Sequence, residues 1–121
     1  EGSIWEALFY ISEKKIKNII LVVDRNRMSA SSFINYKDFF DKKIINNLNI
    51  NKYVINGHNV SQINLIFKKA KNSRKSSVII ANTIKGNGIK EFENSLNFSH
   101  GLPEKKMLET IYNKYEKIYN E

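Results

Sequence analysis

The sequence predicts an α/β fold with a mostly parallel sheet, because short apolar runs alternate with segments of helical periodicity. Three apolar runs are predicted as strands: Ile19–Val23, Tyr53–Ile55 and Ser77–Thr83. The first contains no polar residue before Asp24, which is typical of a strand buried on both faces of a parallel sheet. With 121 residues, 41% of them hydrophobic, the chain is long enough for one compact domain and too short for two.

Four segments show the apolar spacing of amphipathic helices. In the first, residues 3–17, the side chains of Ile4, Leu8 and Ile11 fall on one stripe. The full set of predicted helices is 3–17, Tyr36–Leu48, 60–72 and 103–119. Since the first helix has no strand before it, we expect part of the sheet to lie outside this sequence.

Capping and turn residues support two of these helices. Asn59 or Ser61 can cap the third helix. Pro103 suits the first turn of the last one. The polar segments 25–35 and Ile84–Leu102 are therefore predicted as loops.

The composition excludes several classes of protein. There is no cysteine, which excludes disulfide frameworks, thiolate zinc sites and cysteine nucleophiles. No apolar run exceeds five residues, far below the roughly 18 that a membrane span needs. The net charge is +8, and its densest basic run, Lys68–Lys75, falls between apolar helix positions without a nucleic-acid-binding signature. We interpret that run as a solvated helix face, and we expect neither nucleic acid nor a membrane as partner.

A binding site is predicted at one end of the sheet. In open α/β sheets, ligands bind beyond the carboxyl ends of the strands. Three loops begin at those ends; all are rich in polar residues, and the second and third contain glycine. They start at Asp24-Arg25-Asn26, at Asn56-Gly57-His58 and at Thr83-Ile84-Lys85-Gly86-Asn87-Gly88.

Five motifs, in this order and at this rough spacing, resemble those of transketolases. They are Glu1-Gly2-Ser3-Ile4-Trp5-Glu6-Ala7, Asp24-Arg25-Asn26, Gly57-His58, Thr83-Ile84-Lys85-Gly86-Asn87-Gly88 and His100-Gly101-Leu102-Pro103. The resemblance is to the diphosphate-binding N-terminal domain, which some members carry as a separate subunit. It implies a three-layer α/β/α fold that binds thiamine diphosphate, of which residues 1–121 would be the incomplete, C-terminal part.

The resemblance also implies a metal site. In transketolases an Asp of a Gly-Asp-Gly motif binds Mg²⁺, and an Asn and a backbone carbonyl on the next strand's loop complete the protein ligands. Those two ligands match Asn26 and the carbonyl of Met28, while Asp24 would order the loop. Mg²⁺ takes oxygen ligands in near-octahedral geometry and shares them with phosphates, and we expect Ca²⁺ to be able to replace it. The Gly-Asp-Gly motif is expected just ahead of Glu1, outside this sequence.

Other matched positions are weighed individually. The resemblance gives His100 a catalytic role in contact with the diphosphate and substrate, with Asn97 as an alternative register for a second family histidine. We expect His58 to be structural, through a cap or a core hydrogen bond. The segment Lys85–Gly88 is more simply a turn than a phosphate cradle, because no helix follows it directly. Trp5 is expected in the core or at a subunit interface.

By resemblance, the complete enzyme transfers a two-carbon ketol unit from a ketose phosphate to an aldose. Such a site needs a second, pyrimidine-binding domain or subunit, so we expect this chain alone to be inactive. The complete enzyme is expected to be a cytoplasmic dimer or heterotetramer. Alternatives are a deoxyxylulose-phosphate synthase, a dehydrogenase-type thiamine enzyme subunit, or a non-catalytic α/β remnant that binds a protein or a polyanion.

Overall fold

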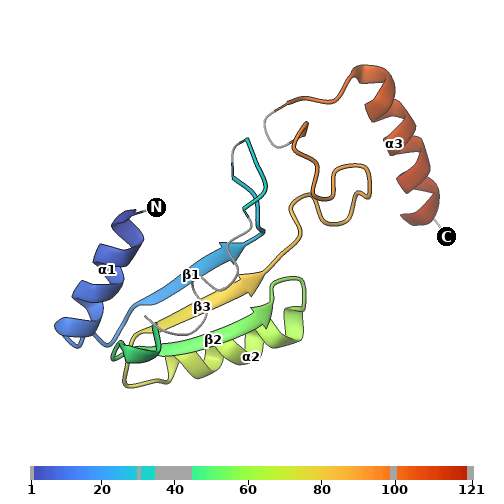
Figure 1. The fold of residues 1–121 in the computed structure, drawn as a ribbon. Helices are drawn as coiled ribbons and strands as arrows, with labels where there is room; N and C mark the ends of the chain where they lie inside the picture. The colour runs from blue at the N-terminus through green and yellow to red at the C-terminus, as the bar shows by residue number, and fades with distance from the viewer. Residues whose placement is uncertain (1, 30, 35–44, 99–100, 120–121) are drawn as a thin grey trace.

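A three-stranded parallel sheet forms the centre of the molecule in the computed structural model, which describes residues 2–29, 31–34, 45–98 and 101–119 (Figure 1). Its strands are β1 (Ile20–Arg25), β2 (Asn51–Asn56) and β3 (Ser77–Asn82), in the order β1-β3-β2. Both outer strands run parallel to β3, and Ile20 and Asn51 both lie opposite Ser77. This confirms the predicted α/β class.

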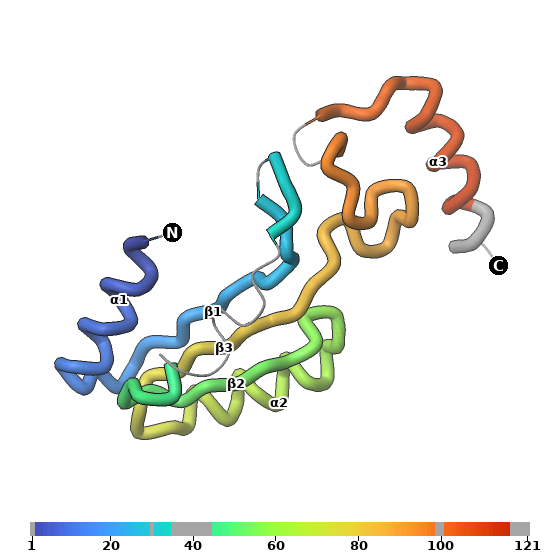
Figure 2. Tube along the Cα trace, in the orientation of Figure 1, coloured from blue at the N-terminus to red at the C-terminus, as the bar shows by residue number. Residues whose placement is uncertain are grey.

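The helices are α1 (Gly2–Glu13), α2 (Val60–Lys71) and α3 (Lys105–Tyr119), with a single turn of 3₁₀ helix, η1, at Ile45–Asn47. Helices α1 and α2 cover opposite faces of the sheet. Helix α3 lies beyond the carboxyl ends of the strands, away from the other two (Figure 2).

The core lies on both faces of β3. On one face Val78 and Ile80 pack with Leu8 of α1 and Ile45 of η1, and the partly buried Trp5 packs against them. On the other face a second cluster joins β3 and β2 to α2; its buried members are Ile55, Ala70, Ile79 and Ala81. Helix, sheet and helix therefore form three layers.

The expectation that Ile19–Val23 is buried on both faces is wrong for the described chain. Val22 is 48% exposed, because β1 is an outer strand, whereas Val78, Ile79 and Ile80 of the central strand are fully buried. Continuous apolarity shows that both faces of a strand favour burial. It does not show which strand occupies the centre.

The first helix ends at Glu13, four residues before the predicted end. It ends in a Schellman motif, in which Lys15 adopts a left-handed conformation (φ 51°), Ile16 N–H bonds to the Ile11 carbonyl, and Lys15 N–H bonds to that of Ser12. The apolar Ile16 therefore sits where it extends the helical stripe without extending the helix. Glycine usually marks such a stop, and here a lysine occupies it.

Other boundaries moved less. The described end of the predicted helix Tyr36–Leu48 is the 3₁₀ turn, and residues 36–44 lie outside the described part. Asn59, rather than Ser61, caps α2 by accepting the N–H of Gln62. Pro103 precedes α3 instead of occupying its first turn, because the first helical hydrogen bond, from Leu108 N–H, ends on the Glu104 carbonyl.

Candidate functional site

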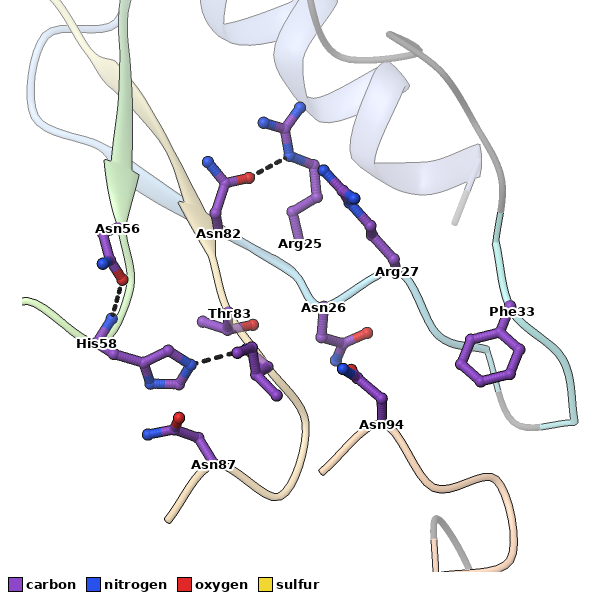
Figure 3. A pocket seen from close by; sticks show the side chains of 11 residues that line it. Arg25, Asn26, Arg27, Phe33, Asn56, His58, Asn82, Thr83, Asn87 and Asn94 are labelled. Carbon is purple, nitrogen blue, oxygen red and sulfur yellow. Dashed lines mark hydrogen bonds between the residues drawn. The ribbon is translucent and has the colours of Figure 1, made fainter. Parts of the chain in front are cut away.

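The loops that follow the three strands meet at one end of the sheet, as predicted, and line an open pocket of about 770 Å³ (Figure 3). Residues from all three loops contribute to it. The lining consists of Arg25, Asn26, Arg27, Phe33, Asn56, His58, Asn82, Thr83, Ile84, Asn87 and Asn94.

The loop after β1 is shaped by the side chain of Asn26. Its Oδ1 accepts the backbone N–H of Met28 at 2.9 Å, and its Nδ2 donates to Asp24 Oδ2 at 3.3 Å. The first bond is an Asx turn, which holds the amide oxygen in a fixed orientation. The Met28 side chain is buried, and its residue pairs with Phe33 in an isolated antiparallel bridge. Met28 could therefore offer a ligand only through its carbonyl.

Two side-chain bonds connect β1 to β3 at the pocket. The Thr83 hydroxyl donates to Asp24 Oδ1, and Arg25 Nε donates to Asn82 Oδ1 at 2.7 Å. Asp24 thus bonds both Asn26 and Thr83, which fits the expected role of ordering the loop. Because Arg25 belongs to β1, the strand reaches two residues further than predicted and carries one pocket residue itself.

A second set of bonds connects β2 to β3. Gly57 N–H bonds to the Asn82 carbonyl at 2.7 Å, and His58 Nε2 accepts the N–H of Ile84 at 2.7 Å. His58 N–H in turn donates to Asn56 Oδ1 at 2.9 Å. The histidine therefore makes a structural hydrogen bond, but the bond is neither the cap nor the core contact that was expected, because the ring is exposed at the wall of the pocket and Asn59 caps α2.

The segment Lys85–Gly88 forms a turn, in which Asn87 N–H bonds to the Ile84 carbonyl and Ile89 N–H to that of Gly86. Gly86 is required there: its φ is +79°, and a Cβ would lie 2.4 Å from the Phe92 carbonyl oxygen. Among the described residues that follow this turn, the next helix to begin is α3, so the turn presents no helix N-terminus to a phosphate.

Helix α3 contacts this loop through polar groups. Lys114 Nζ lies 2.5 Å from Glu91 Oε1, and the Tyr115 hydroxyl accepts the N–H of Lys90 at 2.8 Å. The hydrogen bond from Lys114 lowers the pKa of Glu91, and the same bond raises the pKa of Lys114. The ion pair is partly exposed, so its attraction is screened by solvent.

The charge of the pocket is positive. Two arginines, Arg25 and Arg27, line it, and none of the described lining residues is an aspartate or glutamate. Arg27 is held in a left-handed conformation, with φ 61°, which is uncommon for a residue other than glycine. In Figure 3 its side chain points toward that of Arg25. The pocket is therefore suited to an anion.

The metal ligands expected from the resemblance are present only in part. Asn26 lines the pocket, and its amide oxygen has a second lone pair beside the one engaged by Met28 N–H. Among the described residues no three histidine, aspartate or glutamate side chains gather to hold a metal ion. The described residues alone therefore do not complete a metal site, although Asn26 could offer one oxygen ligand to it.

Two residues for which the sequence suggested a role cannot be placed in the site. His100 and Glu1 lie outside the described residues, so their roles stay predictions. Asn97 is described and exposed, and the neighbouring Phe98 packs against Phe92 with ring centroids 5.0 Å apart. Sequence reasoning singled out neither Arg27 nor Asn94 for this site. Their only shared signal is a left-handed backbone, which the sequence does not reveal.

No helix in the described part of the chain is both long and apolar enough to cross a membrane. No family model matches the sequence. Several known proteins, however, are similar to it in sequence. Transketolase-like protein 2 of Bos taurus is 35% identical over 106 residues, and transketolase of Homo sapiens is 31% identical over 125 residues. These alignments cover 85% and 100% of this chain.

A solved structure agrees with the sequences. Transketolase from Campylobacter jejuni superposes with a TM-score of 0.77 over 94% of this chain, at 29% identity. The chain is a homologue of one segment of transketolases. It spans 17% and 19% of the length of the bovine and human relatives, and 18% of the Campylobacter transketolase chain. The family resemblance of the five motifs is thereby confirmed.

Proposed function

We propose that this transketolase homologue supplies part of a thiamine diphosphate site, in which the carboxyl end of its sheet holds the diphosphate and a divalent metal ion. The observation that carries the proposal is the placement of Asn26. Its amide oxygen is fixed by the Asx turn, at the wall of a positively charged pocket. Residues 1–121 would then be part of a diphosphate-binding domain.

The residues divide the work between metal and phosphate. The amide oxygen of Asn26 and the carbonyl of Met28 are hard oxygen donors, which suit Mg²⁺ or Ca²⁺. Arg25 and Arg27 would attract the phosphates by charge. When bound, thiamine diphosphate supplies the carbanion chemistry, and the protein binds and orients it. His100 keeps its proposed role beside the diphosphate and the substrate.

The reaction we infer for the complete protein is transfer of a two-carbon ketol unit between sugar phosphates. The transketolase names of the relatives described above favour ketol transfer over the synthase and dehydrogenase alternatives. Because the chain spans less than a fifth of those relatives, we infer that it needs a pyrimidine-binding domain or subunit and is inactive alone.

An NMR titration of the ¹⁵N-labelled chain with thiamine diphosphate tests the proposal. With Mg²⁺ present, we expect weak binding whose shift changes concentrate at residues 24–28 and 83–87. Calorimetry should show no binding in the submicromolar range. Shifts scattered over the surface would contradict the proposed site, and submicromolar affinity would contradict the need for a second domain.

A further inference from the structure

His58 takes the place of a backbone acceptor where the pairing of β2 with β3 ends. The last register pair is Asn56 opposite Asn82, and Gly57 N–H adds one bond to the Asn82 carbonyl at 2.7 Å. Beyond the end of β3, the N–H of Ile84 bonds to His58 Nε2 at 2.7 Å. A side chain thus extends the connection between β2 and β3 into the loops that follow them.

The backbone that carries the imidazole is held by hydrogen bonds within its own turn. His58 N–H donates to Asn56 Oδ1 at 2.9 Å, and Asn56 N–H donates to Gln62 Oε1 at 2.9 Å. Gln62 N–H returns to Asn59 Oδ1 at the start of α2, also at 2.9 Å. Although His58 is exposed, its backbone is therefore fixed by a closed set of hydrogen bonds.

Close packing of the two loops brings the ring within reach of Ile84. A Cβ on Gly57 would lie 2.4 Å from Thr83 Cγ2 and 3.1 Å from the Asn82 carbonyl oxygen. Only a residue without a side chain allows this approach. The β2 loop therefore contacts the β3 loop directly, one residue before the histidine.

The hydrogen bond from Ile84 to His58 joins two residues that line the pocket. Ile84 and Asn87 both line the pocket. Thr83, the residue before Ile84, donates to Asp24, which in turn accepts from Asn26. We propose that His58 is a positioning residue of the candidate site: by accepting the Ile84 N–H, it holds the loop after β3 in the conformation that lines the pocket. This inference rests on the proposed function, from which it takes the ligand that the pocket binds.

The protonation state of the ring follows from the bond. A backbone N–H can only donate, so Nε2 must carry a lone pair, and in the neutral ring the proton lies on Nδ1. An imidazolium has no acceptor and could not make this contact.

The ring's tautomer can be measured in the unmodified chain. We expect ¹⁵N NMR near neutral pH to show the Nδ1–H tautomer of His58, with a scalar coupling across the hydrogen bond between Nε2 and the Ile84 nitrogen. Finding the Nε2–H tautomer or the imidazolium there would overturn the proposal without any substitution.

Two variants test whether an acceptor is needed at the position of Nε2. In His58→Gln the amide oxygen can sit near the position of Nε2, whereas in His58→Asn it falls short, near that of Nδ1. We expect Ile84 N–H to exchange with solvent about fivefold faster in His58→Asn than in the wild type, and at close to the wild-type rate in His58→Gln. Equal rates in wild type and His58→Asn would overturn the proposal.

The positioning role has its own readout. The Asn26 and Asn87 side-chain amide resonances should move in His58→Asn and return in His58→Gln, and the shift response to Mg²⁺ with pyrophosphate should follow the same order. Unchanged resonances and response in His58→Asn would reduce His58 to a local bond and overturn its positioning role. A wild-type chain that ignores Mg²⁺ and pyrophosphate would contradict the proposed function, while the tautomer, exchange and amide measurements would still decide about His58.

Discussion

The Thr83 hydroxyl donates to the carboxylate of Asp24, which joins the carboxyl ends of β1 and β3 beside the pocket. Asp24 also accepts from Asn26, so a bond to one strand end helps to orient the proposed metal ligand on the other. The two strand ends therefore behave as one structural unit.

Thr83→Val keeps the shape of this side chain and removes its hydroxyl. We expect a loss of about 0.5–1.5 kcal/mol in the free energy of unfolding, at the modest end for a bond to a charged group because Asp24 is exposed. Urea denaturation measures it. Thr110→Val is the matched control, since Thr110 bonds only within α3, to the Lys106 carbonyl. Equal losses in the two variants would contradict a special role for Thr83.

Gly57→Ala should destabilise the chain by about 1–3 kcal/mol, because the new Cβ would meet Thr83 Cγ2 at 2.4 Å. Gly2→Ala is the control: nothing lies within 4 Å of its Cβ, so we expect no loss. In the double variant Gly57→Ala/Thr83→Ser the clashing methyl is gone, and part of the stability should return. Thermal denaturation compares all three. A Gly57→Ala chain as stable as the Gly2→Ala chain would show that the loops are not closely packed.

Arg27→Gly separates backbone strain from charge. Glycine accepts the left-handed φ of 61° freely, so we expect the folded chain to lose no stability and to gain up to about 1 kcal/mol. The same variant should bind pyrophosphate several-fold more weakly without Mg²⁺, as followed by NMR titration at low salt. Arg74→Gln removes one positive charge outside the pocket lining. If it weakens binding as much as Arg27→Gly does, the effect is one of net charge.

The contact of α3 with the loop should weaken in acid. The pKa of Glu91 is lowered from 4.5 by Lys114, so the stabilisation is present above pH 4.5 and is lost as the pH falls through the lowered value. At the alkaline end, the raised pKa of Lys114 means that the stabilisation is lost only as the pH rises above 10.5 and through the raised value. Amide exchange of Lys90 N–H, which bonds to Tyr115, reports the contact.

Glu91→Gln should abolish the acid-dependent part of that exchange profile, while the surface variant Glu109→Gln on α3 should keep it. A profile in Glu91→Gln that still changes below pH 4.5 as in the wild type would show that another group controls the contact.

Much of the fold could be predicted because the spacing of apolar residues differs between helices and strands. The alternation of apolar runs with helical stripes predicted the parallel sheet, and Asn59, one of the two predicted cap residues, caps α2. The end of α1 was missed because Lys15 adopts a conformation that glycine usually marks. The central strand was misjudged because burial depends on neighbouring strands, which apolarity alone does not specify.

The site was predictable to the level of loops. Parallel strands bring their carboxyl ends to one edge, so the three polar loops had to meet there. Which side chains hold them together was not predictable. The bond from Ile84 to His58 joins residues 26 positions apart, and its formation depends on the close approach at Gly57.

The proposed site depends most directly on Asn26 as a ligand for a metal-bound diphosphate. We expect thiamine diphosphate to bind the chain more tightly with Mg²⁺ than without it, measured by NMR titration. Asn26→Ala should remove most of that Mg²⁺-dependent gain and leave the Mg²⁺-free affinity nearly unchanged, whereas Asn64→Ala on the exposed side of α2 should keep the gain. An Asn26→Ala chain with the full Mg²⁺-dependent gain would contradict the proposed site.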